Sequence, residues 1–217
     1  MATKSYNQYC AVARALDVVG ERWTLLIVRE LLMGPKRFGH LVENLPGIGT
    51  NLLTARLKGL EESGVIEHGR LPPPSGVAVY QLTPLGRELE PVIRSLYRWG
   101  SLTMDGPRPG DRFRSGWAML AMQYAFRPHL AEGLRETYEY RIGDDVFHAR
   151  IDHGTITMRQ SPAEAPDLII ETDAETFEAI AMQRLTLKEA IADERVEVLG
   201  DPGLMERSAE LFGLSND

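Results

Sequence analysis

The sequence predicts an α+β protein of two domains, the first built from short helices and a β-hairpin and the second from a five-stranded sheet with helices. Up to residue 64 of the 217, apolar residues recur at helical spacing, and from 65 to 82 they follow the alternation typical of strands. A segment rich in proline and glycine follows at 104–111, and short alternating runs return after it. We therefore expect domains at 1–103 and 112–217, joined by a linker at 104–111.

The two halves differ in charge, which bears on what each can bind. Residues 1–110 contain 13 lysines and arginines against 10 aspartates and glutamates, whereas residues 111–217 contain 11 against 21. A mildly basic half beside a strongly acidic one favours a nucleic-acid-binding module joined to a part that stays away from nucleic acid. The polar N-terminus lacks the apolar core of a signal peptide, and the most apolar run, 23–33, is broken by Arg29 and Glu30. We therefore expect a cytoplasmic protein without membrane association.

The first domain should contain a helix-turn-helix. Apolar residues at helical spacing predict helices at about 10–19, 22–33, 37–45 and 50–63. The second of these is apolar nearly all round, so it should be the central core helix. The Pro46-Gly47 turn joins the third helix directly to the fourth, and two short helices joined by a tight glycine turn form the helix-turn-helix arrangement.

The fourth helix has two contrasting faces. Thr50 is expected at its N-cap and Gly64 at its C-terminal stop. Its apolar stripe consists of Leu53, Leu57 and Leu60, and its opposite face of Asn51, Thr54, Ala55 and Lys58. A short, polar, acid-free face is typical of a helix that enters the major groove of DNA, and the alternative is an ordinary amphipathic surface helix.

A β-hairpin should follow this helix, with strands at 65–68 and 77–82 around a loop at 70–76. A hairpin in this position is a wing, and Arg70 is placed to touch a phosphate. The first domain is therefore predicted to be a winged helix-turn-helix that binds double-stranded DNA. The candidate DNA-binding residues are Arg37, Thr50, Asn51, Thr54, Arg56, Lys58 and Arg70.

A fifth helix is expected from the Thr83-Pro84 cap to about residue 101, with a kink at Pro91. Its apolar stripe consists of Leu85, Leu89, Val92, Leu96 and Trp99. Because the preceding helices already fill the core of so small a domain, we expect this stripe to pair with a second subunit, with the helix at 10–19 as its companion. The protein should therefore be a homodimer.

Several spaced motifs of residues 6–103 together resemble the HxlR-type winged-helix transcriptional regulators. They are Cys10-x-Val12-Ala13-Arg14-Ala15-Leu16-Asp17, Gly20-x-x-Trp23-Thr24-Leu25-Leu26-Ile27, Arg37-Phe38, Pro46-Gly47-Ile48, Leu53-x-x-Arg56-Leu57-Lys58-x-Leu60-Glu61 and Tyr80-x-Leu82-Thr83-Pro84-Leu85-Gly86. The resemblance implies a dimeric DNA-binding repressor or activator. Members commonly have serine just after the Gly-Ile pair, where this chain has Gly49-Thr50, and this difference bears on base preference and not on the fold.

The second domain should begin with a helix at 114–126. Five strands are expected, the first at 135–142, the fourth at 167–172 and the fifth at 195–199. Three helices should start at caps, namely at Asp173, at the Thr186-x-x-Glu189 capping box and at Asp201-Pro202, and the last of them should run to Phe212.

The pattern of apolar positions and turns over 112–214 resembles the sterol carrier protein type-two-like domain. The motifs are Asp167-Leu168-x-Ile170, Asp173-x-x-Thr176-Phe177, Leu185-Thr186-Leu187-x-x-Ala190 and Val196-x-Val198-x-Gly200-Asp201. The resemblance implies an apolar cavity, which in a regulator would suit a small apolar effector. The alternative is a packed domain that binds no ligand. The candidate ligand-binding residues are Phe147, Ile151, Ile156, Met158, Phe177 and Leu211.

Other chemistries have weaker support. The single cysteine, Cys10, excludes an intrachain disulfide and is either a redox sensor or a small apolar residue of a buried helix face. His148 and His153 lack a third ligand at suitable spacing, so no metal is expected. No catalytic motif and no cofactor motif is present, so we expect no enzyme.

We interpret the chain as a sequence-specific, ligand-responsive DNA-binding transcriptional regulator. Two alternatives remain open. One is a carrier of hydrophobic ligands whose N-terminal domain only dimerises, and the other is a repressor that senses redox state through Cys10.

Overall fold

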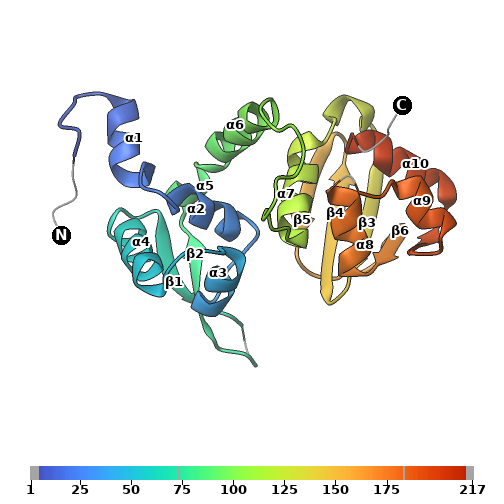
Figure 1. Cartoon of the computed structure of the whole chain (residues 1–217), viewed down its shortest axis with the longest axis horizontal. Coiled ribbons are helices and arrows are strands. Elements are labelled where there is room, and N and C mark those ends of the chain that lie inside the picture. The colour runs from blue at the N-terminus through green and yellow to red at the C-terminus, as the bar shows by residue number, and fades with distance from the viewer. Residues whose placement is uncertain (1–4, 73, 183, 214–217) are drawn as a thin grey trace. The chain divides into compact units, whose positions relative to one another are not determined.

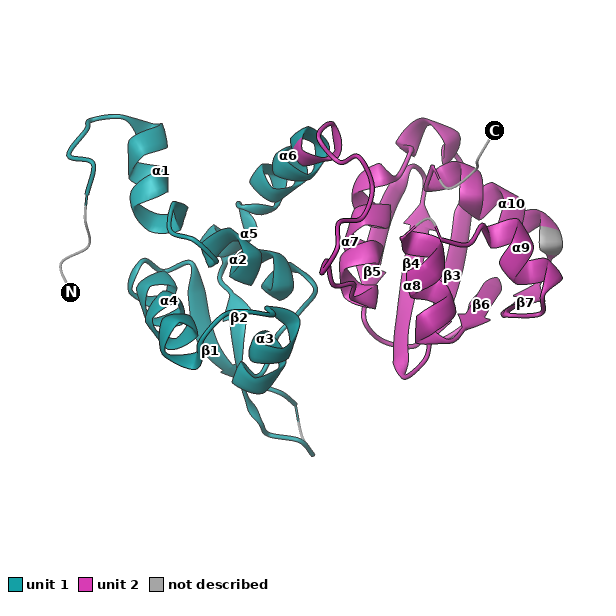
Figure 2. Cartoon of the chain, in the orientation of Figure 1, with its two compact units in different colours: residues 1–99 teal, residues 100–217 magenta. Residues whose placement is uncertain are grey.

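The computed structural model describes residues 5–72, 74–182 and 184–213 (Figure 1). The chain divides into two compact units, residues 1–99 and 100–217 (Figure 2). The described backbone contains mixed α and β structure in both units. The domain boundaries predicted at 103 and 112 stay predictions, since the last helix of unit 1 continues across the division between the units.

Unit 1 is a helix-turn-helix followed by a two-stranded wing. Its elements are α1 (Ala11–Val19), α2 (Thr24–Leu32), α3 (Phe38–Asn44), α4 (Thr50–Glu62), β1 (Ile66–Arg70), β2 (Ala78–Leu82), α5 (Pro84–Arg87) and α6 (Glu90–Ser101). The core gathers fully buried side chains from α2, α3, α4 and both strands, among them Ile27, Leu41, Leu53, Ile66 and Leu82. The predicted order of elements up to the wing is confirmed.

The helix α2 is less completely buried than its composition suggests. Ile27, Val28 and Leu31 lie in the core, but the side chain of Leu26 is 40% exposed. The buried residues agree with the expectation that α2 is the central core helix, although one side of the helix meets solvent. The small unit covers only part of the surface of α2.

The helix α4 begins one residue earlier than predicted and ends as predicted. Gly49 is the N-cap and Thr50 is the first helical residue, so the assignment of Thr50 to the N-cap was wrong. At the other end, Gly64 has φ of +71° and donates to Glu61, while Val65 donates to Leu60 at 2.9 Å. This pair of bonds is the Schellman motif, which glycine favours because it adopts a positive φ without strain.

The strands of the wing are shifted slightly from their predicted positions. Strands β1 and β2 pair antiparallel from Ile66 opposite Leu82 to Arg70 opposite Ala78. The predicted strands were 65–68 and 77–82, so β1 begins one residue later and ends two residues later than predicted, and β2 begins one residue later. Pro73 of the predicted loop lies outside the described residues. Lys36 adds a bridge to Tyr80 through two backbone hydrogen bonds of 3.0 and 2.8 Å. The start of α3 is thereby joined to the wing.

The helix expected from Pro84 to residue 101 is two helices. The Thr83 hydroxyl caps α5 by accepting from the Gly86 amide, as predicted, but the helix breaks at Glu88 and Leu89. Pro91 is the second residue of α6 and does not kink it. In the first turn a missing amide hydrogen costs nothing, because no partner is available to it there.

Unit 2 is a five-stranded sheet packed with helices. Its elements are α7 (Ser115–Ala125), a 3-10 turn η1 (Pro128–Leu130), β3 (Arg135–Ile142), β4 (Asp145–Asp152), β5 (Thr155–Arg159), β6 (Leu168–Thr172), α8 (Ala174–Ala181), α9 (Leu187–Ala192), β7 (Val196–Gly200) and α10 (Pro202–Leu211). The strand order is β5-β4-β3-β6-β7, with β3 and β6 parallel and the other neighbours antiparallel. The five-stranded sheet and all three caps are confirmed, namely Asp173, the Thr186–Glu189 capping box and Asp201.

The register places an apolar set on one face of this sheet. Tyr140 lies opposite Phe147, Tyr138 opposite Ala149, and Ile151 opposite Ile156. Alternation puts charged side chains such as Arg141 and Arg150 on the other face. The apolar face is therefore the one on which the helices build the core of unit 2.

Gly86 and Gly59 make a matched test of packing in unit 1. A Cβ added at Gly86 would lie 2.0 Å from the carbonyl oxygen of Val65, whereas one added at Gly59 would meet nothing within 4 Å. We expect Gly86→Ala to lower the free energy of unfolding by about 1–3 kcal/mol through overpacking. Gly59→Ala, in the interior of α4, should raise it by about 0.5–1 kcal/mol. Urea unfolding of both variants measures the difference, and equal effects would contradict this account of Gly86.

Candidate nucleic-acid interface

The outward face of α4 is exposed and carries no acidic residue before Glu61. Asn51, Thr54, Ala55 and Lys58 are all exposed, opposite the buried Leu53, Leu57 and Leu60. The predicted division of the helix into two faces is confirmed. Amide and hydroxyl groups with one cation can form hydrogen bonds to base edges and phosphates.

Two of these side chains have local hydrogen bonds or charge contacts. The Thr54 hydroxyl donates to the Thr50 carbonyl at 2.9 Å, so its oxygen offers an acceptor and its methyl an apolar contact to an approaching base. Lys58 Nζ lies 3.7 Å from Glu62 Oε1, with both side chains exposed. An exposed pair of this kind is weak, so Lys58 can exchange it for a phosphate.

The other predicted DNA-contacting side chains, three arginines, lie on different elements and differ in how far other residues of the chain already bind them. Arg37 is exposed at the N-cap of α3, and Arg70 is exposed at the end of β1, where its Nη1 donates to Gly76 at 3.2 Å across the wing. Arg56 is held differently. Its Nη2 lies 2.7 Å from Glu21 and its Nε donates to the Arg22 carbonyl at 3.2 Å. The structure thus leaves Arg37 and Arg70 facing solvent and turns Arg56 toward the chain between α1 and α2.

Sequence reasoning missed a link between the wing and α4. His68 Nδ1 on β1 lies 2.6 Å from Glu61 Oε1 at the end of α4, and the His68 ring packs 4.4 Å from the ring of Tyr80. The six residues between Glu61 and His68 include a turn that reverses the chain direction, so neither helical nor strand spacing predicts this contact. The link joins the wing to the helix that it follows.

The six predicted ligand-binding residues of unit 2 form one buried or half-buried set. Phe147, Ile151 and Leu211 are buried, whereas Ile156, Met158 and Phe177 are half-buried. Phe177 packs edge-on against Phe113 at 5.6 Å between ring centroids. Their part in ligand binding stays a prediction.

Cys10 is exposed and occupies the N-cap of α1. The backbone amides of Ala13 and then Val12 hold the pKa of its thiol below the usual range, because they stabilise the thiolate. The expectation of a buried apolar cysteine, one of the two readings of this residue, was wrong.

The described residues offer neither a metal-binding cluster nor a helix suited to a membrane. Among residues 5–72, 74–182 and 184–213, no three His, Cys, Asp or Glu side chains gather where they could hold a metal ion. His148 Nδ1 lies 2.8 Å from the Ser161 carbonyl, and His153 Nε2 lies 2.8 Å from Arg135 Nε. Over the same residues, no helix has the length and apolar character needed to cross a bilayer.

A helix-turn-helix with a wing behind it, and a short polar face on its second helix, defines the winged-helix class of DNA-binding proteins. Comparison with known proteins narrows this class. Residues 18–107 match the model of the HxlR-like helix-turn-helix family. The HTH-type transcriptional regulator sll1512 of Synechocystis is 37% identical over 92 residues, which cover 42% of this chain and 68% of that protein. The chain belongs to the HxlR-like helix-turn-helix family.

Two further regulators match the same part of the chain. YodB of Bacillus subtilis is 35% identical over 97 residues, which cover 45% of this chain and 84% of YodB. Rv3095 of Mycobacterium tuberculosis is 46% identical over 101 residues, 46% of this chain, and the match spans less than two thirds of that protein, at 61%. A crystal structure of quinone-bound YodB matches with a TM-score of 0.37 at 34% identity, over 42% of this chain and 96% of that one.

Unit 2 resembles a different group. Residues 125–216 match the family model of the alkyl sulfatase C-terminal domain. The sec-alkylsulfatase Pisa1 of Pseudomonas sp. matches with a TM-score of 0.39 at 20% identity, over 44% of this chain and 16% of that one. The matched model is thus not the sterol-carrier group that the apolar pattern of 112–214 was expected to belong to.

Asn51 and Lys58 test the assignment of the interface. With an operator selected from random DNA by the wild-type protein, Asn51→Ala should weaken specific binding by about 1–3 kcal/mol, because a base contact is lost. Lys58→Ala should also weaken it. Arg37→Ala or Arg70→Ala should weaken binding to all DNA sequences alike. Each should also reduce the slope of log affinity against log salt concentration by about one.

Gel-shift titrations at several salt concentrations measure these effects. Lys188→Ala, which removes an exposed lysine of α9 in unit 2, is the matched control and should leave affinity unchanged. Unchanged affinity in both Asn51→Ala and Lys58→Ala would show that α4 does not read the operator.

Proposed function

We propose that the protein is a homodimeric, sequence-specific DNA-binding transcriptional regulator and not an enzyme. The observation that carries this proposal is the outward face of α4, which is exposed, short, polar and free of acids in its first three turns. An ordinary surface helix carries mixed charge on such a face. The relatives sll1512 and YodB, which match unit 1, are named as HTH-type transcriptional regulators and support the proposal.

The homodimer is supported by exposed apolar side chains on three helices of unit 1. Trp99 and Leu85, on α6 and α5, are 67% and 59% exposed, and Val92 and Leu96 are exposed beside them. On α1, Val12 and Leu16 are exposed as well. Large apolar side chains that are exposed at successive turns of a helix, as Val92, Leu96 and Trp99 are on α6, mark an interface. A second copy that brings the same surface would cover it by two-fold symmetry.

Dimerisation is expected to set the form of the operator. Two recognition helices related by a two-fold axis read an inverted repeat with half-site centres about 10 base pairs apart, or a multiple of that. Leu96→Asp should yield a monomer that loses most operator affinity. Leu130→Asp in unit 2 is the control, because the two side chains have nearly the same exposure, 44% and 43%. Sedimentation and footprinting measure both effects, and a footprint over a single undivided half-site would contradict the dimer.

Unit 2 is proposed to bind a small apolar effector. The supporting observation is Tyr140, whose side chain is buried in the core and whose hydroxyl has no hydrogen-bond partner among the described residues. Its neighbour Tyr138 donates to Glu136. Burial raises the pKa of Tyr140, so its hydroxyl stays a neutral donor. A buried hydroxyl without a partner costs about 1–3 kcal/mol, which a ligand with one acceptor would recover.

Tyr140→Phe separates this role from a packing role. Without a ligand the variant should be as stable as the wild type or up to about 1 kcal/mol more stable, because it loses an unsatisfied group. Tyr138→Phe is the control and should be less stable, because it breaks the bond to Glu136. Methyl decanoate should raise the melting temperature of the wild type more than decane does, and Tyr140→Phe should remove that difference. Equal responses to both ligands in the wild type would contradict a hydrogen bond from Tyr140.

Regulation requires more than binding. A ligand controls operator affinity only if it binds the DNA-competent and incompetent dimers with affinities that differ, typically by about 1–3 kcal/mol, and operator DNA must then change ligand affinity by the same factor. Ligand titrations with and without operator DNA measure this coupling. Equal affinities would leave unit 2 as a carrier or scaffold, the alternative function for this part of the chain.

Control through Cys10 is a second candidate. It is favoured by the exposure of the thiol and by its lowered pKa, since the thiolate is the form that oxidants attack. Cys10 lies at the start of α1, beside the apolar surface proposed to bind the second copy.

A further inference from the structure

Arg56 lies on the helix predicted to read DNA, but its guanidinium is already engaged. Its Nη2 lies 2.7 Å from Glu21 Oε2, and its Nε donates to the Arg22 carbonyl at 3.2 Å. The side chain is 23% exposed, against 74% for Lys58 two residues on. Arg56 therefore ties α4 to the segment between α1 and α2, which we call the α1–α2 corner, residues 20–23.

The backbone conformation of the α1–α2 corner is tightly constrained. A Cβ at Gly20 would lie 2.5 Å from the carbonyl oxygen of Leu16, so only glycine fits where α1 ends. Trp23 has φ of +79°, a left-handed conformation that is strained for a bulky residue. The Arg22 guanidinium lies 5.3 Å above the Trp23 ring. Strain of this kind persists where the surrounding structure over-determines it.

The corner meets α4 at two separate places. Arg56 reaches it from the second turn of the helix. The Trp23 ring lies against the turn that precedes α4, where a Cβ added at Gly47 would come within 3.8 Å of it. One contact in the turn before α4 and one at its second turn fix both the position and the tilt of the helix relative to the corner. The other side of the corner continues into α1, which carries part of the apolar surface proposed for the second copy.

We propose that Arg56 is a positioning residue, and that the Glu21–Arg56 pair holds the recognition helix at a set angle to α1. In a dimer joined through α1 and α6, that angle determines the distance between the two recognition helices. The pair therefore sets which half-site spacing the dimer prefers. The spacing role rests on the proposed function, while the positioning of α4 does not.

The alternative is that Arg56 leaves Glu21 and binds a phosphate, and the two roles predict opposite signs. If Arg56 binds phosphate, Glu21→Gln removes a competing carboxylate and strengthens DNA binding. If Arg56 positions the helix, Glu21→Gln loosens α4 and weakens binding at the preferred spacing. Arg56→Lys keeps the charge and loses the fork that bonds two oxygens at once. It weakens binding under positioning and leaves it nearly unchanged under phosphate contact.

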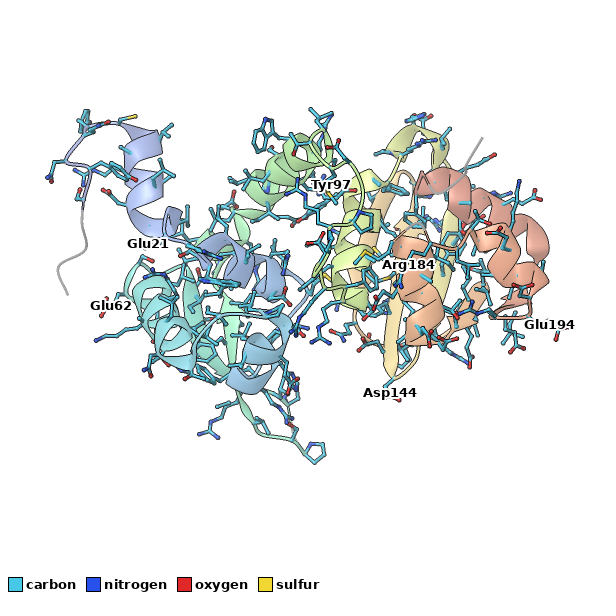
Figure 3. All side chains as sticks on the ribbon, in the orientation of Figure 1. Glu21, Glu62, Tyr97, Asp144, Arg184 and Glu194 are labelled. Carbon is cyan, nitrogen blue, oxygen red and sulfur yellow. The ribbon has the colours of Figure 1, made fainter. Side chains whose placement is uncertain are left out.

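Glu62→Gln is the control for removing a carboxylate that pairs with a proposed phosphate contact, Lys58. Glu62 lies on α4 and its side chain is 65% exposed, against 64% for Glu21 (Figure 3). Any general gain in affinity from removing one carboxylate appears in this variant as well. The effect of Glu21→Gln is therefore read relative to Glu62→Gln.

The experiment uses the full chain and the operator selected from random DNA by the wild type, in its native form and with one base pair added between the half-sites. Glu21→Gln and Arg56→Lys should each reduce the ratio of the two Kd values by about twofold to fivefold, as expected for a partly exposed ion pair. The double variant should be no worse than either single one, because both remove the same contact. A strengthened native complex in Glu21→Gln with an unchanged ratio would overturn the proposal.

A measurement without DNA keeps the positioning of α4 separate from the proposed function. Amide hydrogen exchange of the free protein should be faster over residues 50–56 in Glu21→Gln and Arg56→Lys, and unchanged there in Glu62→Gln. If no DNA is bound by the wild type, the proposed function and the spacing role fail together, while faster exchange still supports the positioning of α4. Unchanged exchange in both variants overturns the positioning role.

Discussion

The burial of one leucine stripe on α4 is the constraint on which the rest of unit 1 depends. Leu53, Leu57 and Leu60 are fully buried, and each contributes on the order of 1.5–3 kcal/mol by leaving water. A rotation of α4 by a third of a turn would expose them, so the core determines which side chains meet solvent. The polar face of Asn51, Thr54 and Lys58 is therefore presented to a partner as a consequence of packing on the opposite side of the helix.

Much of the fold can be predicted from the hydrophobic periodicity and the helix-capping residues of the sequence. Helical spacing located α1 to α4, and alternation located the wing and the sheet of unit 2. Side chains that satisfy backbone groups within three residues, such as Asp173 and Thr186, located helix starts correctly because their partners are local. The same locality explains the success with Gly64, whose positive φ is set by the turn itself.

The sequence was less informative where distant parts of the chain meet. Gly49 and not Thr50 is the N-cap of α4, although threonine is the better capping residue of the two. Arg56 was predicted with the DNA-facing residues from its position on the helix, and its partner Glu21 lies 35 residues earlier. Tyr140 gave no signal at all, because a buried tyrosine in a strand is ordinary until its hydroxyl is seen to lack a partner. The spacing of residues predicts which face of an element a side chain occupies, but it does not predict which distant residue that side chain contacts.

The bridge between Lys36 and Tyr80 has a consequence for how unit 1 engages a partner. It joins the residue before Arg37 to the strand that pairs with β1, and β1 ends at Arg70. The two cations therefore stand on one hydrogen-bonded frame and not on two independent loops. Because their backbones are already ordered, little conformational entropy is lost when both are used at once. A stiff frame of this kind also tolerates little variation in groove width. Its binding therefore depends on the shape of the DNA double helix as well as on its sequence.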